Sequence, residues 1–401
     1  MKQTKLFSTA VLCLCTPPAP LTIRSWRGLR YTAPYLFTYR VHVKERWCQT
    51  SLPEVFAHEF YGTQEFWLNQ IQHGRLLVGG RIVSPDYQLR HDDVIINTVH
   101  FHETPVSAVD TPRILDEHAD WVAVYKPAGI PTHVSGQFRY HALTEWLSRL
   151  LTERHQGPAP PLYTLYRLDR VTSGVVVFAK NVALARQWHQ NASRSSQAPR
   201  HRKVYLARVQ GHVRDIATCT VPLRLDRSVH GCARSYPDPK TGKPSITHFR
   251  PLGYDARTDT SLVECVPITG RTHQIRAHLC FLGHPVANDG LYGGQTSNAL
   301  QTSLPAIAES NPESSVMQGP FSEPTLTQLF SDLQLADALC HHCPYVAPVR
   351  WREDALYRQQ GIWLHALSYR FESAPPERFC WSAHADWPLW ARDFASAVEL
   401  L

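Results

Sequence analysis

Short runs of β-branched and aromatic residues recur along most of this 401-residue chain, and they constrain its fold more than any other feature. Residues 121–126, 174–180, 204–209 and 261–266 read as buried strands, and residues 363–371 alternate apolar and polar side chains. These runs outnumber the helical patterns and lie too close together for a repeated strand–helix–strand arrangement. We therefore predict an α+β fold with flanking helices, in which a mixed sheet is largely antiparallel.

A small unit precedes this sheet. Residues 35–50 alternate as a strand, and residues 52–60 and 65–72 have helical spacing. Short strand-like runs at 74–83 and 92–96 follow. Two polar segments interrupt the rest of the chain and read as surface insertions. We therefore divide the chain into a disordered tail or targeting segment (1–33), the small unit (34–104), the main domain (105–376, with insertions at 193–203 and 295–350) and a C-terminal tail (377–401).

The N-terminal residues before Glu45 indicate the cellular compartment of the protein. No acid appears before Glu45, and an acid-poor, basic start is typical of a mitochondrial presequence. The apolar run at 7–14 leaves a secretory signal open, and a disordered tail is the third alternative. Ten scattered cysteines favour reduced thiols inside a cell. We expect a mitochondrial or cytoplasmic protein, with the mitochondrion preferred, and no run is long enough to predict a membrane span.

The most informative run covers residues 166–174. It places the carboxyl group of Asp169 between Arg167 and Arg170, in a polar turn directly ahead of an apolar strand. Nearby cations lower the pKa of a carboxyl group, and an ionised, positioned carboxylate can act as a nucleophile. An ordinary surface turn with a salt bridge is the alternative, and it is the more frequent case for such a pattern.

Two further runs carry polar side chains at high density. Residues 269–278 include Arg271, Thr272, His273 and Arg276, which suits either phosphate contact or pairing with a carboxylate. A solvated basic helix is the alternative. In residues 202–209, Tyr205 shares one face of a predicted strand with Ala207, and a lone strand tyrosine usually serves packing.

Together these runs resemble the RluA-type family of RNA pseudouridine synthases. The match rests on segments in the family's order: 126–133 (KPAGIPTH), 167–169 with 172–174, 203–207 (KVYLA), 270–276 (GRTHQIR), 283–285 with 290–294, and 364–366. The resemblance covers about residues 35–374 without the two insertions. The unit at 51–104 is similar to the α-L RNA-binding domain of many members. The start of this region resembles the eukaryotic subgroup that acts on tRNA or mRNA.

The resemblance implies roles for individual residues. Asp169 would be the nucleophile that attacks a flipped uridine, and Arg276 would pair with it. Tyr205 would stack on the base and assist the final proton removal, while Arg167 would fill the gap that the base leaves. The family usually has His before Arg-Leu-Asp, whereas this chain has Tyr166. The remaining expected contacts are with substrate (Arg271, Thr272, His273, Gln274, Leu168, Thr172 and Lys126) and with RNA (Arg75 and Arg81).

We therefore expect an RNA pseudouridine synthase that acts on tRNA, with mRNA or rRNA as alternative partners. The reaction is an isomerisation without redox or hydrolysis, so no cofactor is expected, and we expect a monomer. Cys340 and Cys343 form half of a zinc site, but four ligands are needed, so we predict a plain loop and no metal. A catalytically silent RNA-binding protein is the second hypothesis, and a basic structural protein is the third.

Overall fold

The computed structural model describes residues 23–26, 29–60, 62–108, 110–193, 201–226, 233–294, 361–372 and 380–397. They form two compact units, of which the first is mainly Arg30–Pro105 and the second is mainly the chain from Val106 onward. No helix in these ranges is long and apolar enough to cross a membrane. Residues 1–33 were expected to lack structure, but β1 (Ile23–Trp26) and β2 (Leu29–Thr32) are strands.

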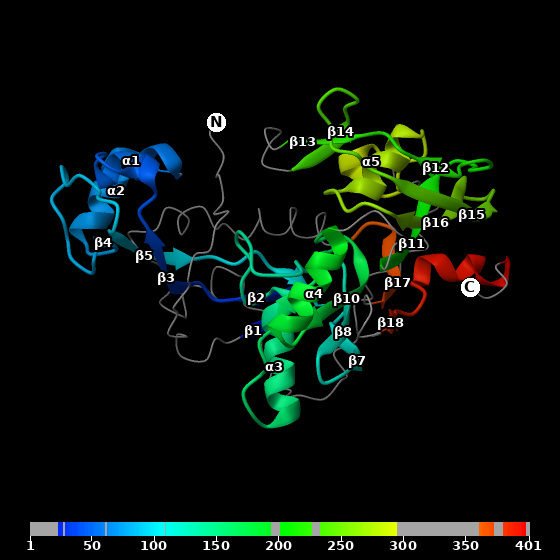
Figure 1. Ribbon diagram of the computed structural model, residues 1–401, viewed down its shortest axis with the longest axis horizontal. Coiled ribbons are helices and arrows are strands. Elements are labelled where there is room, and N and C mark those ends of the chain that lie inside the picture. The colour runs from blue at the N-terminus through cyan, green and yellow to red at the C-terminus, as the bar shows by residue number, and fades with distance from the viewer. Residues whose placement is uncertain are drawn as a thin grey trace, which may run out of the picture. The chain divides into compact units, whose positions relative to one another are not determined.

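The first unit contains two helices and a small sheet (Figure 1). Its elements are β3 (Tyr35–His42), η1 (Glu45–Trp47), α1 (Leu52–Glu59), α2 (Gln64–Gln72), β4 (Leu76–Val78) and β5 (Val94–Phe101). The strand order is β3-β5-β4. Thr63 caps α2 by accepting a hydrogen bond from the Phe66 amide at 3.2 Å. The predicted helices are confirmed, whereas the first strand ends at His42, since a 3-10 turn follows.

The second unit is built on a ten-stranded sheet. Its strands are β7 (Arg113–Glu117), β8 (Trp121–Lys126), β9 (Tyr163–Thr164), β10 (Ser173–Ala179), β11 (His201–Gln210), β12 (Thr218–Cys219), β15 (Thr247–Asp255), β16 (Thr260–Pro267), β17 (Leu364–Glu372) and β18 (Cys380–His384). The main order is β12-β15-β16-β11-β17-β10-β8-β7 (Figure 1). Among the described strands of this sheet, only β10 and β17 pair in parallel. The predicted α+β fold with a largely antiparallel sheet is confirmed.

Helices cover the sheet with regularly spaced apolar side chains. They are α3 (Leu143–His155), α4 (Val182–Ser193) and α5 (Gln274–Phe281). Their buried side chains join those of the strands in the main core: Leu143, Leu147, Leu151, Leu184, Trp188, Ile275 and Leu279. A two-stranded ribbon, β13 (Leu223–Asp226) with β14 (Arg234–Pro237), lies against α5 (Figure 1). The short elements β6 (Val106–Ser107) and η2 (Gly290–Tyr292) complete this unit together with η4 (Leu389–Ala397).

The two faces of β11 differ as its sequence predicted. Tyr205 and Ala207 belong to the main core, whereas Val204 and Leu206 join Phe394 of η4 in a separate cluster. Residues 380–397 fall in the segment expected as a tail, yet they are structured. The strand β18 pairs with β17, and η4 packs on the face of the sheet that carries Val204 and Leu206. The strand β11 begins at His201, so its first three residues overlap the segment expected as an insertion.

The strand β17 comes late in the chain but lies at the centre of the sheet (Figure 1). It pairs with β11 along one edge, and Ala366 on its other edge pairs with Gly174 of β10. Gly174 has φ +116°, and a Cβ built there would lie 2.2 Å from the Ala366 carbonyl oxygen. Only glycine allows this close approach directly after the loop that carries Asp169.

The first prediction concerns this contact. Because an added Cβ meets backbone that cannot move aside, Gly174→Ala should lower the free energy of unfolding by about 2–4 kcal/mol in urea denaturation. Gly157→Ala is the control, since its nearest heavy atom would lie at 3.8 Å. Equal stability of the two variants would contradict the close approach.

Candidate active site

The loop that carries Asp169 joins β9 to β10 in non-helical backbone. Tyr166 and Leu168 are buried, whereas Arg167 is exposed and the Asp169 side chain is 26% exposed. Successive side chains of an extended chain point to opposite sides. The two apolar side chains therefore anchor the loop in the core, while the two charged side chains face outward.

A second segment, which follows β8, braces this loop. The Thr132 hydroxyl donates to the Leu168 carbonyl oxygen at 3.1 Å and accepts from the Leu168 amide at 3.2 Å. The Gly129 amide donates to the Arg170 carbonyl oxygen at 2.7 Å. The backbone is thus held on both sides of Asp169, which fixes the position from which the Asp169 side chain extends.

Lys126 completes this brace. Its side chain has no exposed surface, and its Nζ donates to the carbonyl oxygens of Pro127 and Ile130 at 2.8 Å and of Arg170 at 3.1 Å. Burial lowers the pKa of Lys126 to about 7, and the charge of Asp169 opposes this shift. Three acceptors match the three donors of an ammonium group. With all three donors used, Lys126 positions the loop in this structure, which is a different role from the substrate contact that we expected.

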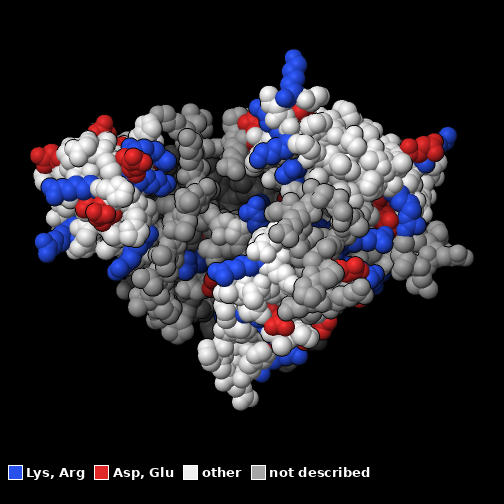
Figure 2. Space-filling view, in the orientation of Figure 1, with Lys and Arg blue, Asp and Glu red and all other residues white. Residues whose placement is uncertain are grey.

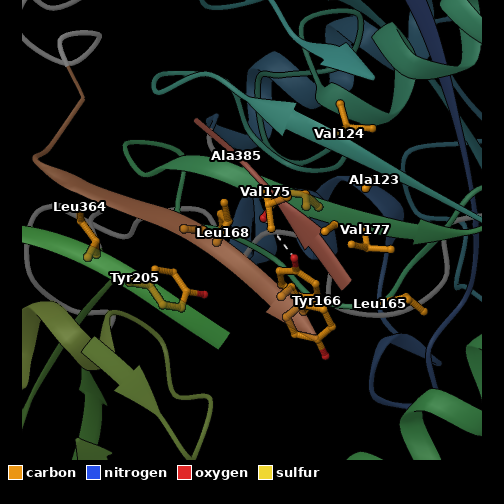
Figure 3. Packing of buried hydrophobic residues seen from close by; sticks show 14 of the residues in the cluster. Ala123, Val124, Leu165, Tyr166, Leu168, Val175, Val177, Tyr205, Leu364 and Ala385 are labelled. Atoms are coloured by element: carbon orange, nitrogen blue, oxygen red, sulfur yellow. Dashed lines mark hydrogen bonds between the residues drawn. The ribbon is translucent and has the colours of Figure 1, made fainter. Parts of the chain in front are cut away.

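Tyr166, at the position where the resemblance implies a histidine, lies inside the core. Its hydroxyl donates to the Val175 carbonyl oxygen at 3.0 Å (Figure 3). Its ring stacks on that of Tyr369 with 4.5 Å between centroids, and the Lys203 Nζ lies 4.7 Å from the Tyr166 ring centroid. Tyr166 therefore anchors the loop in the core, and its hydroxyl donates to a backbone carbonyl oxygen and not to Asp169.

Arg276 projects from the first turn of α5 and meets Asp169. Its Nη1 donates to Asp169 Oδ2 at 3.1 Å. On its other edge, Nε donates to Asp289 Oδ2 at 2.5 Å and Nη2 donates to Asp289 Oδ1 at 2.9 Å. The Arg276 side chain is 4% exposed and that of Asp289 is 1% exposed. A two-point contact fixes the plane of a guanidinium group, so Asp289 aims Nη1 at Asp169.

Electrostatics keep this centre charged. Burial by itself would lower the pKa of Arg276, but hydrogen bonds and charge from Asp289, together with the charge of Asp169, raise it above its ordinary value. The guanidinium carbon lies 4.9 Å from the Tyr292 ring centroid, which adds a cation–π contact. Arg276 is thus a permanent cation that faces one buried carboxylate and one accessible carboxylate.

His273 is the second side chain that faces Asp169. Its Nε2 lies 3.6 Å from Asp169 Oδ2, and its Nδ1 lies 3.1 Å from the Tyr292 hydroxyl oxygen. His273 is the N-cap of α5 and has left-handed backbone with φ 53° and ψ 25°. Burial lowers its pKa, Arg276 acts in the same direction, and the charges of Asp169 and Asp289 oppose the shift.

Tyr205 enters the site from β11. It is 8% exposed and belongs to the same buried cluster as Leu168 (Figure 3). Burial and then the negative charge of Asp169 raise the pKa of Tyr205. Among the residues that the structure describes, none forms a hydrogen bond with its hydroxyl. The structure thus brings together Asp169, Arg276, His273 and Tyr205 from three separate segments.

Gln274 has no polar group left for a substrate. Its Nε2 donates to the Ile246 carbonyl oxygen at 2.9 Å and to Thr247 Oγ1 at 3.0 Å. Its Oε1 accepts from Thr269 Oγ1 at 2.7 Å and from the Arg271 amide at 3.0 Å. These bonds fasten the turn before α5 to β15, which makes Gln274 a positioning residue instead of the expected substrate contact.

The other expected contacts differ in accessibility. Thr172 is 2% exposed, and its amide donates to the Asp169 carbonyl oxygen at 3.1 Å, so it shapes the loop. Thr272 is half-buried and Arg271 is exposed. In the first unit, Arg75 is half-buried and Arg81 is exposed after the turn that follows β4. Basic side chains are spread over the visible face of that unit (Figure 2).

Sequence reasoning missed three residues of the site. Asp289 and Tyr292 hold Arg276 and His273, and Thr132 holds the backbone of Leu168. Thr132 and Tyr292 lie in segments that carried the family resemblance, and Asp289 directly precedes one of them. A single Asp, Tyr or Thr has no spacing that reveals a buried partner. Among the described residues, no group of His, Cys, Asp and Glu could hold a metal ion, and the Cys340 and Cys343 pair lies outside them.

Comparisons with known proteins show which family this sequence matches. Residues 120–280 match the family described as RNA pseudouridylate synthase. RNA pseudouridine synthase 7 of Oryza sativa is 32% identical over 380 residues, which cover 91% of this chain and 90% of the relative. Human pseudouridylate synthase RPUSD2 is 40% identical over 66% of this chain and 46% of its own length. The yeast (Saccharomyces cerevisiae) tRNA pseudouridine(32) synthase, mitochondrial, is 31% identical over 90% of this chain and 77% of its own.

The chain therefore belongs to the RluA-type RNA pseudouridine synthases and is an isomerase. The family, the enzyme class and the RNA modification predicted from the sequence are confirmed.

The second prediction separates the two carboxylates that Arg276 contacts. Asp289→Asn should lower the free energy of unfolding by about 3–5 kcal/mol, because it leaves a buried cation without its buried partner. Asp169→Asn should cost about 1 kcal/mol or less, because that carboxylate is partly solvated. Urea denaturation of both variants measures the difference, and equal losses would contradict the assignment of Asp289 as the residue that holds Arg276.

Proposed function

We propose that this enzyme converts a uridine in the anticodon loop of tRNA to pseudouridine, with Asp169 as the nucleophile. The observation that carries the proposal is the contact of an accessible carboxylate with a buried, fixed guanidinium group, 3.1 Å apart. An ordinary surface salt bridge has no buried second carboxylate that orients its arginine, as Asp289 orients Arg276.

The two oxygens of Asp169 differ in their surroundings. Oδ2 accepts from Arg276 and lies 3.6 Å from His273, whereas Oδ1 has no hydrogen-bond partner among the described residues. A nucleophile needs an available lone pair and a fixed approach. We therefore assign Oδ1 as the attacking atom and Oδ2 as the atom that Arg276 holds.

The uridine must leave its stack before it can reach Asp169, which costs a few kcal/mol. An aromatic ring returns about 1–3 kcal/mol by stacking on the everted base. Tyr205 is suited to this role because its ring lies close enough to Asp169 for the charge of that carboxylate to raise the Tyr205 pKa. Arg167 is exposed beside Asp169, and its planar guanidinium group suits stacking in the gap that the base leaves.

The choice of tRNA rests on the first unit and on one relative. Two helices and a small sheet in Arg30–Pro105 are compatible with the α-L RNA-binding domain, where Arg75 and Arg81 would contact phosphates. The yeast relative that matches 90% of this chain is named for position 32 of tRNA and for the mitochondrion. Together with the acid-poor N-terminal segment, this name supports a mitochondrial enzyme.

The third prediction tests the nucleophile. Asp169→Ala and Asp169→Asn should abolish tritium release from RNA that contains 5-³H-uridine, while RNA binding stays within a few-fold of the wild type. Asp215→Asn, at an exposed position, is the matched control and should release tritium normally. Release by either Asp169 variant at the wild-type rate would refute the role of Asp169 and favour a silent RNA-binding protein.

The fourth prediction tests the target. In cells that lack the gene, pseudouridine mapping should show loss at a tRNA anticodon-loop position, in the mitochondrial fraction rather than the cytosolic one. The wild-type gene should restore the modification, and the Asp169→Ala gene should not. Loss confined to mRNA or rRNA would exclude tRNA as the target, and loss in cytosolic tRNA alone would exclude the mitochondrion.

A further inference from the structure

The Tyr292 hydroxyl determines which nitrogen of His273 carries a proton. It accepts from the Ser235 amide at 2.9 Å and donates to the Ser235 carbonyl oxygen at 3.0 Å. A hydroxyl has one proton and two lone pairs, and a carbonyl oxygen can only accept. The remaining lone pair therefore faces His273 Nδ1 at 3.1 Å, which must be the donor. In the neutral imidazole, Nε2 then has no proton.

The free lone pair of Nε2 is directed into the reaction site. Nε2 lies 3.6 Å from Asp169 Oδ2, too far for a hydrogen bond, and the His273 side chain is 14% exposed. The charged groups that face the ring are Asp169, Arg276 and Asp289. Their effects partly cancel, and burial keeps the pKa of His273 below its usual value. At neutral pH the imidazole is therefore mostly an unprotonated base beside the nucleophile.

Tyr205 does not suit the same task. A phenol accepts a proton only after it has lost its own, and burial together with the charge of Asp169 raises the pKa of Tyr205. At neutral pH the phenolate form is scarce, so Tyr205 offers a stacking surface but no strong base. The reaction nevertheless requires a base, because the C5 hydrogen of uracil must leave as a proton.

We propose that Nε2 of His273 is the general base that removes this proton, an inference that rests on the proposed nucleophilic role of Asp169. Attack of Asp169 Oδ1 on C1′ breaks the glycosidic bond and leaves its electron pair on N1 of the uracil anion. C5 then bonds to C1′ as the Oδ1–C1′ bond breaks and its electron pair returns to the Asp169 carboxylate. C5 becomes tetrahedral, with a double bond between N1 and C6. Nε2 then takes the C5 proton, and the C–H electron pair forms the C5–C6 double bond. The N1–C6 double-bond pair moves to N1, which takes up a proton from the imidazolium or from water.

The experiment compares two RNA substrates. A 5-fluorouridine RNA can undergo every step up to the new C5–C1′ bond, but fluorine cannot leave as a cation, so no base acts on it. A 5-³H-uridine RNA reports the proton removal itself. For His273→Asn, whose amide can still donate to Tyr292, the rate of tritium release should fall about 10²–10⁴-fold. The single-turnover rate of 5-fluorouridine consumption should stay within about twofold of the wild type.

Each outcome decides between roles. If His273→Asn lowers the rates of tritium release and of 5-fluorouridine consumption equally, the proposal is overturned and His273 is a positioning residue for Asp169. Unchanged tritium release would overturn it in favour of another base, such as the regenerated Asp169 carboxylate. Failure of Asp169→Ala to stop consumption of 5-fluorouridine would instead refute the proposed function, so the two failures are distinguishable. If His273→Asn does not fold, His273→Gln is measured in the same way.

The matched control is His248→Asn. His248 is exposed, and its Nδ1 also lies close to a hydroxyl, at 2.8 Å from Thr218 Oγ1, so the substitution removes a similar contact away from the site. The pH dependence gives a second readout. Because the base must be unprotonated, wild-type tritium release should fall as the pH drops below about 6.5, through the lowered pKa of His273. This fall in rate at low pH should be absent from the pH profile of His273→Asn, and its persistence would contradict the assignment of His273 as the base.

Discussion

The two-sided contact of Arg276 is the interaction on which the site depends. One edge of the guanidinium group is held by the buried Asp289, and the other edge presents a donor to Asp169. Burying an arginine is expensive unless its donors are satisfied, and the buried Asp289 carboxylate offsets most of that cost. The protein therefore uses a buried ion pair to give an accessible carboxylate one orientation.

The rest of the fold delivers the partners of this contact. The sheet brings β10 and β11 to either side of β17, so the Asp169 loop and Tyr205 meet although they are far apart in the chain. Lys126 and Thr132 fix the loop through its backbone, which leaves the Asp169 side chain free to react. Preorganisation of this kind places the reacting group in advance, and it reduces the entropy lost when the RNA binds.

The sequence predicted the fold class well, because strand-forming runs depend on local pattern. It also predicted the pairing of Asp169 with Arg276, but only through the family resemblance, since the residues alone favoured a surface turn. It could not separate side chains that touch the substrate from those that hold the loop. Lys126 and Gln274 were expected at the substrate, yet their donors are used inside the protein. Lys126 donates to backbone carbonyl oxygens, and Gln274 donates to one such oxygen and to the Thr247 hydroxyl. That distinction depends on burial and on partners distant in sequence, as does the role of Asp289.

A crystal structure of the enzyme with a tRNA anticodon stem-loop that carries 5-fluorouridine would test the central claim most directly. We expect an everted base stacked on Tyr205, with Asp169 Oδ1 bonded to the nucleoside or within about 3.5 Å of it, and with Arg276 still bonded to Oδ2. A base that stays in the RNA stack, or an Asp169 side chain that turns away from the nucleoside, would contradict it.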